Sequence, residues 1–174
     1  MSANRTPPRI LIAFYSRTGN TRAVALDLAE LLHADVEEIV DFEKRSGMFG
    51  YLRSGRQAFW RRTVPIKPAL HRPGEYDLVV LGTPIWNVSV SAPVRSYVRE
   101  HRRAMKAAAF FCTCGGVGID RVFEQLSEES GHEPIARLAV LEKSMGSDAA
   151  HRRIEAFANQ IQLACGLKSE RRSA

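Results

Sequence analysis

The chain has 174 residues, which is long enough for one domain with a substantial buried core. Its 45% hydrophobic and 25% charged residues match an ordinary globular protein and exclude a disordered or fibrous one. No apolar run reaches the roughly 18 residues that a membrane-spanning helix needs, and the N-terminal "MSANRTPPR" lacks the apolar stretch of a secretory signal. We therefore expect a cytoplasmic protein.

The net charge of +6 is unevenly distributed along the sequence. Residues 44–72 contain eight Lys and Arg and no Asp or Glu. This segment is either a solvated, arginine-rich surface or a docking patch for an acidic partner or an anionic cosubstrate. The three cysteines, Cys112, Cys114 and Cys165, are too few to indicate a disulfide framework, which favours a reducing compartment.

The first part of the chain alternates between strand and helix patterns. Residues 9–15, "RILIAFY", form a short apolar run typical of a strand buried on both faces. Residues 20–34 place Val24, Leu28, Leu31 and Leu32 on one stripe of a helix, and residues 35–42 indicate a second strand. Residues 43–75 exceed the few residues that such a connection needs, so we interpret them as an insertion.

The remaining elements keep the same alternation as far as the C-terminus. Pro93 suits the first turn of a helix, Gly131 suits a helix C-cap, and Ser147 or Asp148 suits a helix N-cap. The predicted elements are a strand at 76–84, a helix at 92–106, a strand at 107–114, a helix at 119–130, a strand at 133–141 and a helix at 147–166.

Strands that alternate with helices predict an α/β fold, in which a mostly parallel sheet carries helices on both faces. Five predicted strands suggest the doubly wound order 2-1-3-4-5, whose ligand crevice lies at the carboxyl ends of the first and third strands. We predict one domain over residues 1–174, with the basic insertion at 43–75 between the second and third strands.

The six residues "SRTGNT", Ser16 to Thr21, connect the first predicted strand to the first predicted helix. A helix N-terminus offers free backbone N–H groups and a partial positive charge, both of which favour an anion. No lysine follows the glycine, so the segment is not a nucleotide P-loop, nor does it read G-x-G-x-x-G. Uncharged donors suit a monophosphate ester held without a metal. A plain capped turn would use the same residue types.

Three stretches resemble the flavodoxin-like proteins. "SRTGNT" resembles the [ST]-x-T-G-x-T fingerprint with which flavodoxins bind the phosphate of FMN. "YDLVVLGTPIWNVSVSAPVRSYV" resembles their third strand and second flavin loop, and "AFFCTCGG" resembles their fourth strand and third flavin loop. The three motifs occur in order, each after a predicted strand, and the resemblance spans residues 9–165 apart from the insertion.

The resemblance implies a flavodoxin-like, five-stranded doubly wound domain that binds FMN non-covalently. Trp86 would stack on the flavin ring, although it would instead pack on the insertion or a helix if its role were structural. The phosphate would lie on Ser16, Arg17, Thr18, Gly19, Asn20 and Thr21. The ring would lie between one loop containing Thr83, Pro84, Ile85, Trp86, Asn87 and Val88 and another containing Thr113, Cys114, Gly115 and Gly116.

Two departures from the flavodoxin pattern bear on the reaction. Residues 112–118 contain no aromatic side chain, so one face of the ring is either open or covered by aromatic residues of the insertion, namely Phe49, Tyr51, Phe59 and Trp60. The usual acidic surround is also missing, which removes the reason for a very low reduction potential. An open face suits hydride transfer from NAD(P)H or reduction of a quinone.

The leading functional hypothesis is electron transfer, either as a flavodoxin-type carrier or as a small NAD(P)H-dependent flavin or quinone reductase. The sequence leaves open whether the protein is an enzyme. We expect no catalytic side chain, because the cofactor carries the redox chemistry. The expected partners are a redox protein or a small acceptor such as a quinone, and reductases of this kind often form homo-oligomers.

A second hypothesis from another class is a flavin-free interaction module that uses the basic, aromatic insertion at 43–75. No RNA- or DNA-binding motif accompanies it, so nucleic acid is not indicated. The cysteines and the scattered histidines show no metal-ligand spacing, and Cys114 lacks the C-x5-R pattern of phosphatases. Cys112 and Cys114 are expected to be small buried residues.

Overall fold

A six-stranded sheet forms the centre of the computed structural model, which describes residues 7–42 and 63–166. Five of its strands are parallel and follow the order β2-β1-β3-β5-β6, which is the predicted order 2-1-3-4-5. The prediction of the fold class is therefore confirmed. The strands are β1 (Ile10–Phe14), β2 (Asp35–Glu38), β3 (Leu78–Trp86), β4 (Ser89–Val90), β5 (Ala108–Cys114) and β6 (Arg137–Leu141).

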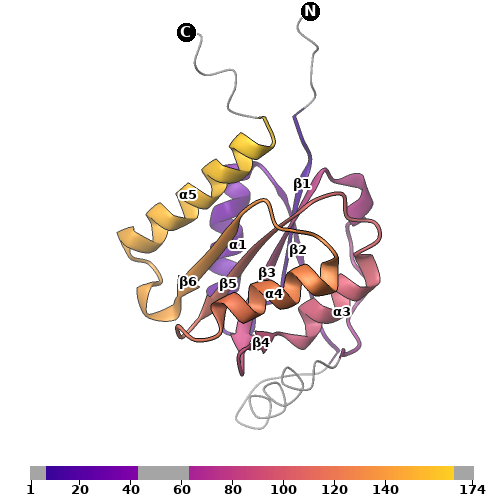
Figure 1. The fold of residues 1–174 in the computed structure, drawn as a ribbon, viewed down its shortest axis with the longest axis horizontal. Helices are drawn as coiled ribbons and strands as arrows, with labels where there is room; N and C mark the ends of the chain where they lie inside the picture. Colours follow the sequence, from indigo (N-terminus) through magenta and orange to yellow (C-terminus); the bar gives the residue numbers. More distant parts are fainter. Residues whose placement is uncertain (1–6, 43–62, 167–174) are drawn as a thin grey trace, which may run out of the picture.

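Helices cover both faces of this sheet. Figure 1 shows α1 (Asn20–Leu32) and α5 (Asp148–Ala164) on one side, and α3 (Ala92–His101) and α4 (Ile119–Ser130) on the other. Short 3-10 turns, η1 (Pro73–Glu75) and η2 (Glu142–Ser144), precede β3 and follow β6. Within the described ranges, no helix is both long and apolar enough to cross a membrane.

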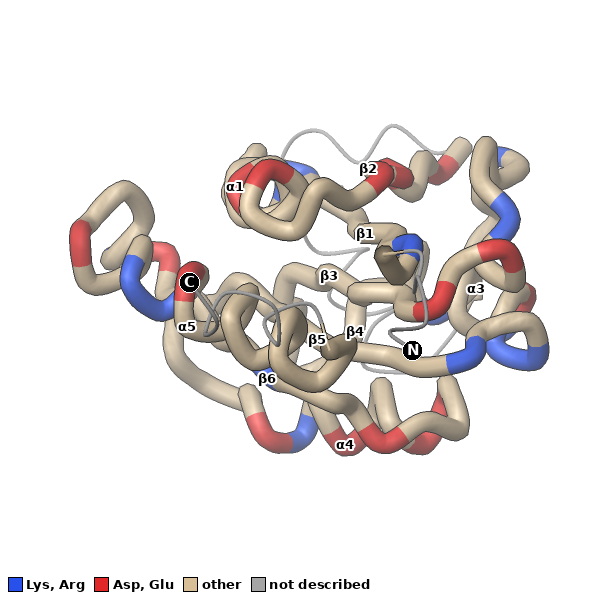
Figure 2. Tube along the Cα trace, turned by 90° about the horizontal axis from the view of Figure 1, so that it is seen from above, with Lys and Arg blue, Asp and Glu red and all other residues tan. Residues whose placement is uncertain are grey.

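The two faces of the sheet carry two separate apolar cores. Side chains alternate along a strand, so Ile12 and Phe14 of β1 pack towards α1 and α5, whereas Ala13 packs towards α3 and α4. Full burial of an aliphatic side chain stabilises the fold by about 1.5 to 3 kcal/mol, which explains why β1, β3 and β5 are almost continuously apolar. Figure 2 shows the charged residues mainly on the surrounding helices and connections.

The helix boundaries agree with most of the predicted capping residues. Ser147 is the N-cap of α5 and its Oγ accepts a hydrogen bond from the Ala150 N–H, while Gly131 ends α4 with a left-handed φ of 73°. Pro93 lies in the first turn of α3, as predicted. The helix α3 ends at His101 rather than at residue 106, because the chain turns there and the Ala104 N–H bonds to the His101 carbonyl.

Residues 39–42 were expected to continue the second strand, but after Ile39, whose N–H still donates to the Phe14 carbonyl of β1, residues 40–42 pair with the returning end of the insertion. Asp41 and Ile66 form an antiparallel bridge, and the Lys67 N–H donates to the Val40 carbonyl at 2.7 Å. This explains why β2 ends at Glu38. The predicted aromatic residues of the insertion, Phe49, Tyr51, Phe59 and Trp60, lie outside the described residues.

The described end of the insertion is held by two buried polar side chains. Glu37 of β2 is 4% exposed, and its Oε2 accepts hydrogen bonds from the backbone N–H groups of Leu70 and His71 at 2.9 and 2.8 Å. The Ser96 hydroxyl of α3 accepts from the Val64 N–H and donates to the Val64 carbonyl. Residues 63–72 are thus attached to both the sheet and α3.

Candidate functional site

The three segments expected to bind a cofactor lie at one edge of the sheet, at the carboxyl ends of β1, β3 and β5. The strands β1 and β5 both pair with β3, which aligns Phe14 with Gly82 and Pro84 with Thr113. This edge is the lower one in Figure 1, where β4 is labelled. The structure therefore brings together the three segments that the sequence spreads over a hundred residues.

The loop between β1 and α1 presents an uncapped helix N-terminus. Gly19 is the N-cap residue and has φ 98°, a left-handed conformation that favours glycine. Its N–H donates to the Ser16 Oγ at 3.2 Å, and no side chain caps the helix. The next N–H groups have no intrahelical partner and carry the positive end of the helix dipole. A Cβ placed on Gly19 would meet no atom within 4 Å, so the space beside this loop is open.

The Trp86 side chain is buried beneath the candidate site and is not exposed on its surface. Its side chain is 9% exposed and packs in the core below α3 and α4. The Tyr15 ring meets it edge-on with centroids 5.5 Å apart, and the Arg17 guanidinium carbon lies 5.4 Å from its ring centroid. A planar ligand that stacks on Trp86 would therefore have to displace Arg17 from that ring. Stacking of a flavin on Trp86 stays a prediction.

Residues 85–90, which follow the predicted end of the third strand at residue 84, form a tight hairpin. The strand β3 continues to Trp86, and the two-residue strand β4 pairs back onto it. Asn87 and Val88 make the turn with φ values of 48° and 58°, as a two-residue hairpin of primed type requires. A β-branched residue such as Val88 rarely adopts a positive φ, so this turn is strained.

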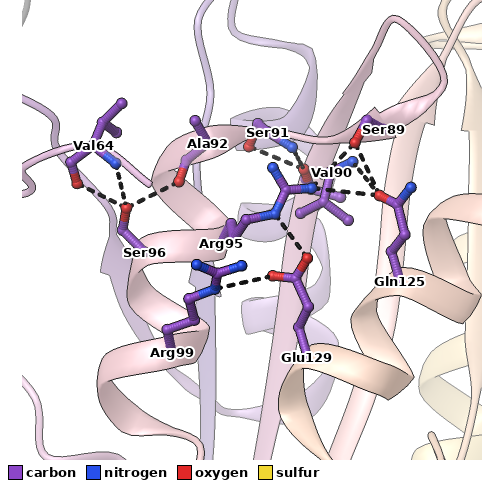
Figure 3. A network of polar contacts seen from close by, with 11 residues as sticks. Val64, Ser89, Val90, Ser91, Ala92, Arg95, Ser96, Arg99, Gln125 and Glu129 are labelled. Carbon is purple, nitrogen blue, oxygen red and sulfur yellow. Dashed lines mark hydrogen bonds and ion pairs between the residues drawn. The ribbon is translucent and has the colours of Figure 1, made fainter. Parts of the chain in front are cut away.

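A buried network of polar side chains holds this hairpin from behind (Figure 3). Arg95 of α3 is fully buried, and its Nε donates to the Glu129 Oε1 of α4 at 2.7 Å. Its Nη2 donates to the Ser89 Oγ at 3.1 Å. The Gln125 Oε1 accepts from the Ser89 hydroxyl at 2.9 Å and from the Val90 N–H at 3.1 Å. Sequence reasoning missed this network.

The buried Thr83 side chain forms hydrogen bonds that hold β3 to the start of α3. Its hydroxyl lies 3.0 Å from the Ser91 Oγ and accepts from the Ser91 N–H at 3.1 Å. Ser91 is the N-cap of α3, so Thr83 fixes the point at which that helix begins. The side chain of Thr83 is fully buried, so it lies beneath the surface that a cofactor would contact.

The third segment has a buried part and an exposed part. Thr113 and Cys114 end β5 with 1% and 2% exposure, whereas Gly115 and Gly116 are exposed. A Cβ placed on Gly115 would meet no atom within 4 Å. The exposed surface available for ligand contact is therefore mainly glycine and backbone on this side of the site.

The thiols of Cys112 and Cys114 lie on the same side of β5 and interact. A hydrogen bond from the Cys112 thiol lowers the pKa of Cys114 to about 7, with a further contribution from the Gly116 N–H. The same bond and burial raise the pKa of Cys112 above its ordinary range. Cys114 is therefore the thiol of the pair that ionises first.

A separate cleft of about 790 Å³ lies at the opposite edge of the sheet, near the start of β1 and the end of α1. Its lining includes Arg9, Leu31, Asp35 and Gln162. Open α/β sheets bind their ligands outside the carboxyl ends of the strands, which this cleft does not face. We therefore assign the candidate site to the lower edge in Figure 1.

Comparisons with known proteins identify the fold through solved structures. The sequence matches no family model and no curated protein. A flavoprotein in complex with FMN from Lactobacillus acidophilus NCFM superposes with a TM-score of 0.67 at 18% identity, covering 83% of this chain and 99% of that one. A putative flavoprotein from Bacteroides eggerthii gives 0.69 at 21% identity, covering 87% and 98% of the two chains.

A flavodoxin gives a similar result. Oxidised flavodoxin 1 from Bacillus cereus superposes with a TM-score of 0.54 at 17% identity, covering 87% of this chain and 95% of that one. Matches at this level of identity report the architecture of the chain. Together with the order of the strands, they show that this chain has the flavodoxin-like fold that its sequence motifs predict.

Proposed function

We propose that the chain binds FMN non-covalently at the carboxyl edge of β1, β3 and β5 and acts in electron transfer. The observation that carries the proposal is the Ser16–Thr21 loop. It combines a left-handed Gly19 with an uncapped helix N-terminus beside open space. The same fold holds FMN in the Lactobacillus acidophilus flavoprotein. The proposal is thus supported by the loop's own chemistry as well as by the fold.

The loop fits a phosphate dianion because its donors are numerous and none of its side chains is acidic. The exposed Thr18 hydroxyl, the Ser16 hydroxyl and the free N–H groups at the start of α1 would hold it. The hairpin at 85–88 and the glycines 115–116 would border the ring. FMN supplies one- and two-electron chemistry when bound, and the chain supplies position and electrostatics.

The cation of Arg17 would influence the redox properties of this site. It is half-buried and lies against Trp86, at the edge where the ring would bind. A positive charge near a redox group favours the addition of electrons. We therefore propose a reduction potential above that of a cofactor with an acidic surround.

We further propose that NAD(P)H donates the electrons and that a redox protein or a quinone accepts them. The exposed glycines 115 and 116 support this, because they leave room for a second planar group beside the site. Stopped-flow mixing of the FMN-loaded protein with NADPH is the test. Loss of the visible flavin absorbance within minutes indicates a reductase, whereas unchanged absorbance indicates a carrier loaded by another protein.

Titration of the protein with FMN, followed by quenching of flavin fluorescence, tests the binding proposal directly. The variant Thr18→Asp places a carboxylate against the phosphate and should weaken FMN binding at least about fivefold, since like charges near a protein surface repel by about 1 to 4 kcal/mol. Thr18 is exposed, so the fold should be unaffected.

Thr18→Asn is the matched control, because it has the same shape as aspartate without the charge. Equal FMN affinity in Thr18→Asp and Thr18→Asn would remove this loop from the site. A colourless protein that does not bind added FMN would overturn the whole proposal and favour the flavin-free interaction module.

A further inference from the structure

Two buried threonines connect the start of α1 to the end of β5. The Oγ1 atoms of Thr21 and Thr113 lie 2.8 Å apart, although the residues are 92 positions apart in the sequence. The side chains are 2% and 1% exposed. Thr113 shares a face of β5 with Phe111, which packs in the core towards α1 and α5. The Thr113 hydroxyl therefore lies under the first turn of α1 and not on the exposed surface of the third segment.

The two hydroxyls can donate more hydrogen bonds than the pair itself uses. Each hydroxyl has one proton to donate and two lone pairs that accept. The hydrogen bond between Thr21 and Thr113 uses one of the two protons. Among the described residues, no other acceptor is recorded for either hydroxyl. A buried donor without an acceptor costs about 1 to 3 kcal/mol. A ligand atom that accepts a hydrogen bond from the remaining hydroxyl would remove this cost.

An anion bound at the helix N-terminus would determine the direction of the bond. A phosphate dianion only accepts hydrogen bonds. If the phosphate accepts a hydrogen bond from the Thr21 hydroxyl, the hydrogen bond between Thr21 and Thr113 must be donated by Thr113. We propose that Thr113 is a positioning residue for the anion, one that donates to Thr21 and so orients the Thr21 hydroxyl towards the phosphate. This inference rests on the proposed function, because it names how that site holds its phosphate.

A purely structural pair would behave differently when it is replaced. Exchanging both partners of a buried hydrogen bond for apolar groups of the same shape is often nearly neutral for stability. Valine has the shape of threonine and suits a strand. If the pair served the fold alone, valine at both positions would change neither stability nor ligand affinity. A role in orienting a phosphate donor predicts a loss confined to ligands that carry the phosphate.

The experiment compares FMN with riboflavin, which has the same ring and no phosphate. Dissociation constants for both are measured by fluorescence quenching in the wild type, Thr113→Val and Thr113→Ser. We expect Thr113→Val to weaken FMN binding roughly threefold to tenfold, the size of one net hydrogen bond, and to leave riboflavin binding within about twofold. Thr113→Ser keeps the hydroxyl and should restore the wild-type ratio of the two constants.

Three outcomes would overturn the inference while leaving the proposed function intact. Equal weakening of FMN and riboflavin binding in Thr113→Val would indicate a structural role. Unchanged dissociation constants for both ligands would show that the Thr113 hydroxyl does not act on the site. Tighter FMN binding would mean that Thr21 donates to Thr113 and that the pair competes with the phosphate.

Folding of each variant is checked by thermal unfolding. If Thr113→Val does not fold, Thr113→Ala removes the same hydroxyl without a branched side chain, and the same ratio is measured. A wild-type protein that binds riboflavin but not FMN would overturn the phosphate assignment and this inference together. A wild type that binds neither ligand would overturn the proposed function itself.

Discussion

The loop at 16–21 and the hairpin at 85–90 lie at the same edge of the sheet but are built in different ways. The loop's shape comes from neighbouring residues, since Gly19 takes a left-handed φ and donates to the Ser16 hydroxyl three positions earlier. The hairpin's shape comes from distant residues, since Arg95 of α3 and Gln125 of α4 hold Ser89 from below.

This difference teaches that two neighbouring parts of one candidate site can respond differently to mutation. A substitution at the exposed Thr18 of the loop should alter ligand binding and leave most of the stability in place, because that side chain buries little. A substitution in the network below the hairpin should lower stability first, because it leaves a charge or a donor buried without its partner. The following predictions separate these two behaviours.

The largest effect is expected from Arg95→Met. Removing the buried guanidinium leaves the Glu129 carboxylate, which is 9% exposed, without its 2.7 Å partner. Breaking a buried ion pair on one side costs about 3 to 5 kcal/mol, so the urea unfolding midpoint should fall sharply. The control is Arg99→Ala, because Arg99 is half exposed and lies 3.9 Å from the same carboxylate. That change should cost less than about 1 kcal/mol. Similar losses in both variants would contradict the prediction.

Gln125→Leu should give the next largest effect. The Val90 N–H and the Ser89 hydroxyl lose their common acceptor, at a cost of about 1 to 3 kcal/mol of unfolding free energy. Because the hairpin borders the proposed ring site, the affinities for FMN and for riboflavin should fall by the same factor. Gln162→Leu is the control, since Gln162 donates to the Leu31 carbonyl at the opposite edge of the sheet. A loss of riboflavin affinity in both variants would show that the effect is not local.

Gly19→Ala should cost about 1 to 2 kcal/mol of stability, because a Cβ disfavours the left-handed backbone. The space around a Cβ is open, so the cost comes from the backbone alone. Gly115→Ala has the same open space without a positive φ and should be nearly neutral. Equal unfolding midpoints for the two variants would indicate that the loop adopts another conformation in solution.

A smaller effect concerns pH. The pKa of Cys114 is about 7 in the folded chain, below its ordinary value of 9.0, because the Cys112 thiol donates to it. Folding therefore favours the thiolate. The resulting stability is complete above about pH 9 and is lost as the pH falls through 7. Thiolate absorbance in the ultraviolet should titrate at higher pH in Cys112→Ala than in the wild type, and an unchanged titration would contradict the proposed hydrogen bond.

The order of the sheet was predictable from sequence because each parallel strand is a short apolar run between helix patterns. The two-residue strand β4 was not predicted, since Ser89 and Val90 are too few to show a period. The length of β3 was underestimated for a related reason: Pro84 suggests the end of a strand, but it lies within β3 beside Thr113 of β5.

The location of the candidate site was predictable from the sequence, but the directions and partners of its buried side chains were not. The sequence locates Thr83 and Thr113 after apolar runs and does not say which way they point. The alternation of side chains along each strand could have given this direction, because residues two positions apart point to the same face of the sheet. Thr113 shares its face with Phe111, and Thr83 shares its face with Leu81. Arg95 gave no comparable signal. An arginine in an amphipathic helix is expected on its exposed face, and its partner Glu129 is 34 positions away.

The bridge between Asp41 and Ile66 has a consequence for how this chain tolerates changes in length. The two ends of the connection are already side by side and hydrogen-bonded. Each doubling of a flexible connection that joins two fixed points costs only about 0.6 kcal/mol of closure entropy. A flexible linker placed between residues 42 and 63 should therefore cost little stability, because Val64 keeps its hydrogen bonds to Ser96 and Ile66 keeps its bridge to Asp41.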